Sequence, residues 1–445
     1  MIHFPEDRYS DIRIENRYQT DITIENKVLR QNKTRVTQGA MIRIYDGDKW
    51  YYAATTRLDD LQGEVDRLAA MSRSNKDIRL DKTVSSFEVH QDVCLRYQAQ
   101  PVNRVPQEEK LALLQRYSEI AGESAAVVIC KAYYRDTYET RHFLSSKGAD
   151  ILFDFQSAAV AIRYNLTVGG KQGRGSRDIV KTDFASLSGY EDAIREEIEK
   201  DIEFFTQAKP VEEGRYTCVL APLVTGVFAH ESFGHKSEAD FMIGDEAMMK
   251  AWAIGSVVGS PELNITDRGD LEGSGYVPYD DEGTKARCND IIKDGRLTGR
   301  LHSAATSASL QESLTGNARA LHFEFEPIVR MTHTSIEPGN LSKDELLSTV
   351  EKGLFIETLY HGSGMTTFTI APHRAYMIRD GKIAEPVLVS VISGNVMETL
   401  HKIDGFSREV GSYSFALGGC GKMEQAPLRV GFGGPFIRVN DILVQ

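Results

Sequence analysis

The N-terminal part of the chain has the hydrophobic period of a β-sheet. Apolar and polar residues alternate through residues 11–54, as in strands that are buried on one face. The inward positions carry isoleucine, at Ile12, Ile14, Ile22, Ile24, Ile42 and Ile44. An Asp46-Gly47 pair between two of these runs predicts a hairpin turn. The period then changes to that of an amphipathic helix, marked by Leu58, Leu61, Val65 and Leu68.

Further along, the pattern predicts a helix near 108–121 and consecutive strands through 124–168. Apolar residues at helical spacing then mark a long charged helix, at Ile194, Ile198, Ile202 and Phe205. Pro210, followed by two glutamates and a glycine, is the strongest boundary signal in the chain. Beyond it the sequence becomes rich in strand and hairpin signals. We therefore predict two domains, at residues 1–208 and 209–445.

A His-Glu-x-x-x-His run at residues 230–235 carries the first candidate chemistry. It follows an apolar stretch at 223–228 with helical spacing, so a helix is expected here. On a regular helix, residues five apart point about 140° away from each other. A π turn would bring His230 and His235 together, and Gly234 is the cheapest place for such a distortion. The sequence predicts a bulged helix that holds a metal; two core histidines on a straight helix are the alternative.

Catalytic zinc sites commonly have three protein ligands, so a third residue is needed. Cys420 is the first choice, because it stands in Gly-Gly-Cys-Gly-Lys, where the glycines allow close approach and Lys422 favours the thiolate. A simple glycine turn that contains a thiol is the alternative. The other candidate ligands are Glu238, His322, His333 and His361.

Composition and charge narrow the function classes. The chain has 445 residues and a formal net charge of −12, which argues against a surface that binds nucleic acid directly. Five cysteines at irregular spacing suggest reduced thiols. The N-terminus has no signal-peptide pattern, and no apolar run is long enough to cross a membrane. We expect a cytoplasmic protein without a membrane span.

With these motifs in place, the chain resembles the TldD/PmbA metallopeptidases, a family long called modulators of DNA gyrase. The likeness rests on the His-Glu-x-x-x-His run, the Gly-Gly-Cys420-Gly-Lys segment and four further segments of the C-terminal half. These begin at Asp280, Gly316, Pro327 and Ile392. Because every metal position is kept, the chain resembles the catalytic TldD-like kind.

The resemblance implies an α+β fold of two domains. These are an N-terminal α/β domain of strands and amphipathic helices and a C-terminal, mostly antiparallel β domain that carries the metal-motif helix. It also implies Zn²⁺ held by His230, His235 and Cys420, with Glu231 as the general base that takes a proton from a zinc-activated water. The substrates would be unfolded or short peptides, and the assembly a homodimer or a heterodimer with a PmbA-like subunit.

Several points stay open at this stage. An oxyanion-stabilising residue could be any of Tyr279, His322, Arg330 or His333. One rival function is a non-catalytic peptide-binding subunit with a structural metal. The other is a cysteine hydrolase that uses Cys420 as its nucleophile.

Overall fold

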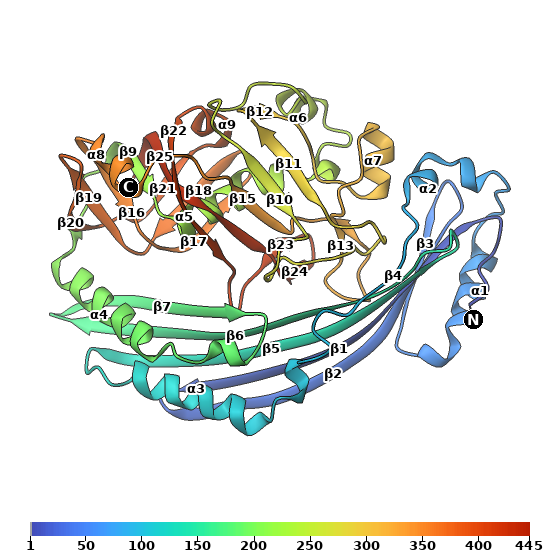
Figure 1. Cartoon of the computed structure of the whole chain (residues 1–445), viewed down its shortest axis with the longest axis horizontal. Coiled ribbons are helices and arrows are strands. Elements are labelled where there is room, and N and C mark those ends of the chain that lie inside the picture. The colour runs from blue at the N-terminus through green and yellow to red at the C-terminus, as the bar shows by residue number, and fades with distance from the viewer. Residues whose placement is uncertain (1) are drawn as a thin grey trace.

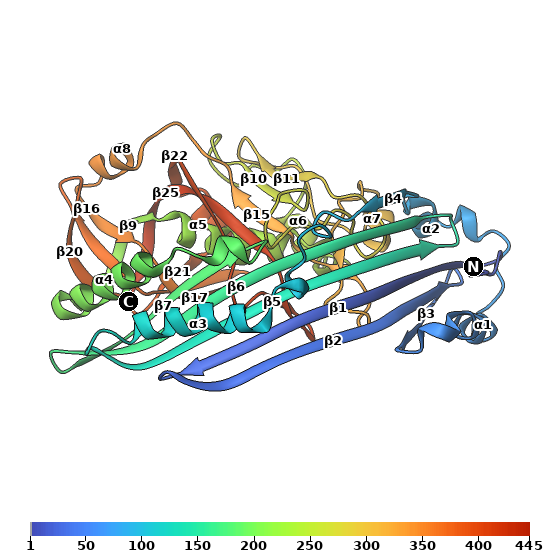
Figure 2. The same ribbon diagram turned by 60° about the horizontal axis from the view of Figure 1, so that its bottom comes forward.

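A computed structural model describes residues 2–445 and contains two large β-sheets, one from each part of the chain (Figure 1). The first sheet has seven strands, β1 (Tyr9–Glu25), β2 (Val28–Tyr45), β3 (Trp50–Thr55), β4 (Gln91–Cys94), β5 (Val127–Ser145), β6 (Asp150–Val168) and β7 (Lys171–Lys181). Its helices are α1 (Leu61–Met71), α2 (Lys82–Ser86), α3 (Gln107–Ala121) and α4 (Glu191–Gln207). The sheet is long and curved, and the part of the chain that follows α4 lies in its hollow (Figures 1 and 2).

Two long hairpins, β1–β2 and β5–β6, form the centre of this sheet. They lie side by side because β1 also pairs antiparallel with β5, from Asp11 opposite Ser145 to Glu25 opposite Lys131. Five of the six predicted inward isoleucines are buried and Ile14 is partly buried, on the outer face where α1, α3 and α4 pack. The alternating pattern and the helix predictions of this region are therefore confirmed.

The opposite, concave face of the sheet is also buried, although its residues are charged. Arg13, Glu15, Glu139 and Arg141 lie along β1 and β5, each with no more than 6% of its surface exposed. The guanidinium of Arg13 bonds the carboxylate of Glu15 at 2.7 Å, and that of Arg141 bonds Glu139 at 2.6 Å. Alternation alone would have assigned these polar residues to solvent, but the C-terminal domain covers them.

A short acidic segment of the C-terminal domain forms much of this contact. Asp281 accepts a hydrogen bond from Arg141, and Glu282 accepts one from Arg43 of β2 at 3.0 Å. Asp280 accepts the backbone N–H groups of Glu282 and Thr284 in its own loop and that of Ala318 from a distant segment, and so fixes the shape and place of the loop. The acidic motif thus joins the two domains through buried ion pairs.

The second sheet has fourteen strands and is mostly antiparallel. The strands that follow α4 are β8 (Lys209–Pro210), β9 (Gly214–Leu220), β10 (Ile265–Arg268), β11 (Cys288–Lys293), β12 (Arg296–Leu297), β13 (Ala318–Arg319), β14 (Ile328–Val329), β15 (His333–Ile336), β16 (Lys352–Ile356), β17 (Leu359–Gly364), β18 (Thr367–Pro372), β19 (Ala375–Arg379), β20 (Lys382–Leu388), β21 (Ile392–Asn395), β22 (Ile403–Tyr413), β23 (Cys420–Lys422), β24 (Gln425–Leu428) and β25 (Gly431–Val444). The helices are α5 (Pro222–Ala229), α6 (Glu246–Ala251), α7 (Ala304–Leu310), α8 (Lys343–Ser348) and α9 (Val396–Leu400). Of these strands, β13–β14 and β23–β24 form two separate two-stranded sheets, and the other fourteen form the one large sheet. β25 lies at the centre of the large sheet, where it pairs with β9, β15, β21 and β22.

The helix α5 fixes where the candidate site lies. It begins with Pro222 at its first position, and seven of its eight residues are buried against the sheet core. Gly226 allows this packing, because a Cβ there would lie 2.8 Å from the backbone nitrogen of Gly433 on β25. The end of α5 is thereby held directly against the central strand.

The predicted α+β layout with two domains is confirmed, since one sheet closes with β7 and the other opens with β8. The boundary at residue 208 itself stays a prediction. Within residues 2–445, no helix is both long enough and apolar enough to cross a membrane.

We expect the buried ion pairs between the domains to be needed for stability. Replacing Arg141 with methionine removes the nearest cation from the buried carboxylates of Glu139 and Asp281, whose next guanidinium groups, of Arg17 and Arg13, lie 3.8 and 3.7 Å away. Breaking one partner out of such a buried pair typically costs about 3–5 kcal/mol. Urea unfolding of Arg141→Met measures the loss. Arg195→Met is the matched control, because Arg195 makes comparable bonds on the surface, where water and salt screen the pair and its contribution to stability is small. Equal losses for the two variants would contradict this assignment.

Candidate metal centre

The two histidines of the motif lie on a single π turn that continues α5. This turn spans His230–Gly234, and the N–H of His235 donates to the carbonyl oxygen of His230, five residues earlier. The extra residue in the turn brings both imidazoles to the same side, with ring centroids 5.2 Å apart. The predicted bulged helix is confirmed.

A glycine stands at position 234 for a different reason from the one that the sequence suggests. Its backbone is ordinary right-handed helix, with φ −55° and ψ −58°, so no special glycine conformation is used. A Cβ at this position would instead lie 1.8 Å from the sulfur of Met331, which is completely buried. The glycine is required by close packing behind the turn.

Cys420 reaches the same place from the short hairpin β23–β24, 185 residues further along the chain. Its Sγ lies 3.6 Å from Nε2 of His235. One potential ligand atom from each of His230, His235 and Cys420 lies within 4.8 Å of the others, and all three residues are buried. The structure therefore brings together the three residues that the motifs singled out.

The hairpin is held in place by a buried arginine. Arg330 donates to the carbonyl oxygens of Cys420 at 2.7 Å and of Gln425 at 3.1 Å. Gly419 allows the two strands to approach, because a Cβ there would lie 2.4 Å from the carbonyl oxygen of Leu428. Arg330 was one candidate for oxyanion stabilisation, but its two bonds go to the backbone that carries the thiol.

The charges of the cluster suit a cation. Burial alone would raise the pKa of the Cys420 thiol, but the adjacent His230 and His235 imidazoles outweigh it and hold this pKa well below its ordinary value. Burial would lower the pKa of His235, yet its hydrogen bonds with Cys420 and Glu238 raise it to about 10. A thiolate thus faces a ring nitrogen that a metal ion could take over from a proton.

The donor set and an unpaired atom both fit a metal. One thiolate sulfur and two imidazole nitrogens form a ligand set that zinc accepts. Nδ1 of His230 is buried and has no hydrogen-bond partner among residues 2–445. Burying polar atoms without partners costs free energy, and a cation bound by these three side chains would offset that cost.

Glu231 lies on the same π turn, one residue after His230. Burial raises the pKa of its carboxyl group. Two glycines of β17 lie beside it: a Cβ on Gly362 would lie 3.6 Å from Cγ of Glu231, and one on Gly364 would lie 2.8 Å from its carbonyl oxygen. Glu231 therefore lies beside a strand that presents only backbone at these two positions.

Glu238, which the sequence offers as an alternative ligand, lies beside the cluster and contacts it through His235. Its Oε2 accepts a hydrogen bond from Nδ1 of His235 at 3.2 Å, on the side of the ring away from Cys420. The pKa of Glu238 is lowered because its bonds to His235 and Lys422 outweigh its complete burial. A carboxylate on the second nitrogen is the usual partner of a metal-binding histidine, and the i,i+3 spacing from His235 was the signal for this role.

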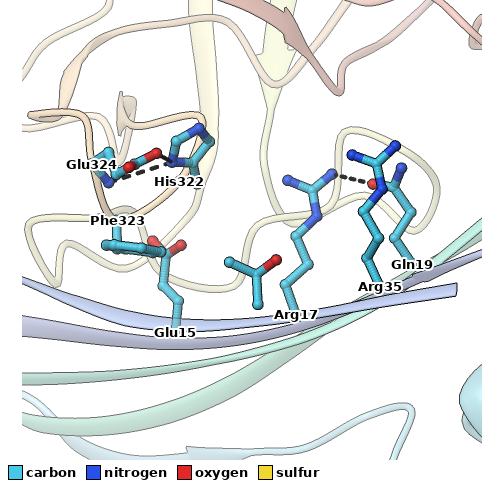
Figure 3. Close-up of a pocket in the computed structure, with 8 residues that line it drawn as sticks. Glu15, Arg17, Gln19, Arg35, His322, Phe323 and Glu324 are labelled. Atoms are coloured by element: carbon cyan, nitrogen blue, oxygen red, sulfur yellow. Dashed lines mark hydrogen bonds and ion pairs between the residues drawn. The ribbon is translucent and has the colours of Figure 1, made fainter. Parts of the chain in front are cut away.

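The remaining candidates lie outside the cluster. His361 is exposed on β17, and Tyr279 donates to Asp92 of the first domain at 2.6 Å. His333 lines a cavity of about 250 Å³ together with Tyr413 and Gly431. His322 lines another cavity, of about 280 Å³, between its loop and the concave face of the first sheet, where it pairs with Glu324 (Figure 3).

Lys422 also differs from the expectation. Its ammonium group bonds the carboxylates of Asp240 and Glu238, while the pKa of the thiol is lowered by the two imidazoles. All five cysteines of the chain are free, as their irregular spacing suggested.

Comparison with known proteins places these features in a family. The sequence profile of the PmbA/TldA metallopeptidase C-terminal domain matches residues 213–445, and that of domain 1 matches residues 10–75. A metalloprotease from Synechocystis sp. is 31% identical over 449 residues, which cover 98% of this chain and 94% of that protein. A zinc metalloprotease TldD homologue from Saccharolobus solfataricus is 27% identical over 447 residues, covering 98% and 96%.

The fold has a close counterpart among solved structures. TldE from Thermococcus kodakarensis superimposes with a TM-score of 0.80 over 98% of this chain and 96% of that one, at 15% sequence identity. This likeness concerns the fold alone. Because the C-terminal profile spans more than half of the chain and the two named relatives span nearly all of it, the chain belongs to the PmbA/TldA metallopeptidase family.

Proposed function

We propose that this chain is a zinc-dependent peptidase that hydrolyses unfolded or short peptides. In this proposal His230, His235 and Cys420 hold the zinc ion, and Glu231 is the general base. One observation carries it: three buried ligand side chains from distant segments meet within 4.8 Å, with a glutamate on the same turn.

The number of ligand side chains supports a catalytic rather than a structural metal. The cluster has three members, and no fourth His, Cys, Asp or Glu joins it among residues 2–445. Structural zinc sites usually have four protein ligands, whereas catalytic sites have three and leave one position for solvent or substrate. This favours the peptidase over a binding subunit with a structural metal.

The chain's own residues account for the proton transfers. Bound zinc would supply Lewis acidity, which activates water and polarises the scissile carbonyl group. Glu231 accepts the proton of the attacking water and then gives it to the nitrogen of the leaving amine. Glu231 stands on the same π turn as His230, so its backbone is fixed relative to the ligands. Glu238 holds the ring of His235 through Nδ1.

Burial of the site favours flexible substrates. His230, His235 and Cys420 are each no more than 9% exposed, so the surface of a folded protein would not reach them. A short peptide or an unfolded segment has the freedom to enter such a site. This supports the proposed substrate class.

A cysteine hydrolase is a second candidate, because one contact favours it. The Sγ of Cys420, the ring of His235 and the carboxylate of Glu238 stand in the order nucleophile, base and orienting group. However, His230 adds a second imidazole to the same sulfur, and a thiol nucleophile does not need one. Family membership also favours the metal reading.

Removing the proposed base should separate catalysis from metal binding. We expect Glu231→Gln to lower kcat for peptide hydrolysis by at least about 10²-fold, the usual contribution of a general base, because an amide cannot take up the proton. Elemental analysis should find the metal content unchanged. Glu109→Gln, an exposed glutamate on α3, is the control and should keep full activity. Full activity in Glu231→Gln would rule out this assignment.

Metal removal distinguishes the two candidate reactions. We expect dialysis against a chelator to abolish hydrolysis, and added Zn²⁺ to restore it, since the ligands and not the thiol alone carry the activity. Cys420→Ala should lose both bound zinc and activity. An enzyme that keeps its activity through chelation but loses it in Cys420→Ala would be a cysteine hydrolase.

We also propose that the chain acts as a dimer, either with itself or with a PmbA-like subunit. Residues 28–38 of β2 form a long edge that pairs only with β1, and Val28, Leu29 and Val36 on it are at least 45% exposed. Such open edges favour association. Light scattering should give twice the mass of one chain, alone or after mixing with a PmbA-like subunit. A monomer under both conditions would refute this proposal.

A further inference from the structure

The strand that carries Cys420 also places a lysine next to the metal cluster. Cys420 and Lys422 are two residues apart on β23, so they share one face of the strand. Both are buried, while Gly421 between them is exposed. The sulfur and the ammonium group therefore face the same segment, residues 230–241, in which the π turn is followed by two short 3₁₀ turns.

All hydrogen-bonding capacity of the Lys422 ammonium is used in this position. Its Nζ lies 2.6 and 2.8 Å from the two carboxylate oxygens of Asp240 and 3.1 Å from Oε2 of Glu238. It also donates to the carbonyl oxygen of Val329 at 2.8 Å. A lysine has three N–H donors, and each has an acceptor here.

These contacts form a closed circuit of residues that includes two of the candidate ligands, His235 and Cys420. Lys422 holds Glu238, Glu238 accepts from Nδ1 of His235, and Nε2 of His235 faces the sulfur of Cys420. Cys420 is joined back to Lys422 through the backbone of β23. The same oxygen of Glu238, Oε2, contacts both the lysine and the imidazole.

We infer that Lys422 and Glu238 are positioning residues, which together set the orientation of the His235 ring toward the cation. This inference rests on the proposed metal-binding role of His230, His235 and Cys420. An imidazole can turn about its bond to Cβ, and a carboxylate fixed at Nδ1 limits that rotation. Lys422 fixes the carboxylate, and because it lies on the strand of Cys420, both ligands are held to one frame.

Glu238 needs such a partner because it is completely buried. Its second oxygen, Oε1, has no hydrogen-bond partner among residues 2–445, so Oε2 carries all of its contacts. Without the ammonium group, the imidazole of His235 would be its only hydrogen-bond partner among residues 2–445. The carboxylate would then be free to rotate, and the ring with it. Loss of the partners that orient a metal ligand typically lowers metal affinity by about 10–100-fold.

The test measures metal affinity separately from stability. We expect Lys422→Met, which keeps the length of the side chain, to raise the Kd for Zn²⁺ by about 10–100-fold in a competition titration with a chromophoric chelator. Lys110→Met is the matched control. Lys110 is also buried and bonds Asp136 at 2.6 Å, but it lies on α3 against the first sheet. It should lower the melting temperature and leave the Kd unchanged.

Two further variants keep the inference testable if Lys422→Met folds poorly. Glu238→Gln removes the charge at the other end of the same contact and should raise the Kd by a similar factor. The double variant should be no weaker than the weaker single variant, because both changes break one chain of contacts. Lys422→Arg should recover part of the affinity. The absorption bands of bound Co²⁺ should shift in Lys422→Met and keep their position in Lys110→Met.

The outcomes separate this inference from the proposed function. Wild-type Kd and Co²⁺ bands in Lys422→Met would overturn the positioning role, and so would an equal loss of affinity in Lys110→Met. If wild-type protein binds one zinc ion and Glu231→Gln is inactive, the proposed function stands in either case. If wild-type protein binds no metal, the proposed function itself fails.

Discussion

One backbone hydrogen bond, from the N–H of His235 to the carbonyl of His230, determines whether this chain can have a metal centre. A regular helix would bond each N–H four residues back and would turn the two rings apart. The π turn moves the second ring round by one residue, so that both imidazoles meet the thiol of Cys420. Everything around the turn supports it: the buried helix α5, the close contact of Gly234 with Met331, and the hairpin held by Arg330.

The fold gives this local distortion a rigid setting. β25 is hydrogen-bonded to strands along both of its edges, and α5 packs directly against it at Gly226. The second domain in turn is seated in the hollow of the first sheet (Figure 1) by ion pairs such as Arg43 with Glu282. These buried ion pairs are also hydrogen bonds, which require a defined position of both groups. They therefore favour one relative position of the two domains over a range of positions.

The sequence was informative wherever a local rule decides the structure. Alternation located the buried isoleucines of β1 and β2, and the five-residue spacing predicted the π turn. Glycines around a cysteine predicted the close approach of Cys420. The charged face of the first sheet was not predictable, because alternating polar residues such as Glu15 and Arg141 look the same whether water or another domain covers them.

Two side chains, Lys422 and Arg330, differ from the sequence-based predictions for the same reason, because their partners come from distant parts of the chain. Its closeness in sequence predicts that Lys422 acts on the Cys420 thiol. Its ammonium group instead bonds the carboxylates of Asp240 and Glu238, which follow the π turn. Arg330 was a candidate for the reaction itself, but it holds the hairpin backbone. In each case the partner comes from a distant segment, and only the tertiary fold determines which one it is.

The separation of the three side chains along the sequence has a consequence for stability. His230 and His235 belong to one local turn, but the sulfur of Cys420, 185 residues beyond His235, reaches them only when its hairpin is folded against that turn. The complete cluster therefore exists only in the folded second domain, and an unfolded chain offers a cation two neighbouring imidazoles at most. A cation held by all three side chains would bind the folded state in preference to the unfolded one and would raise the free energy of unfolding.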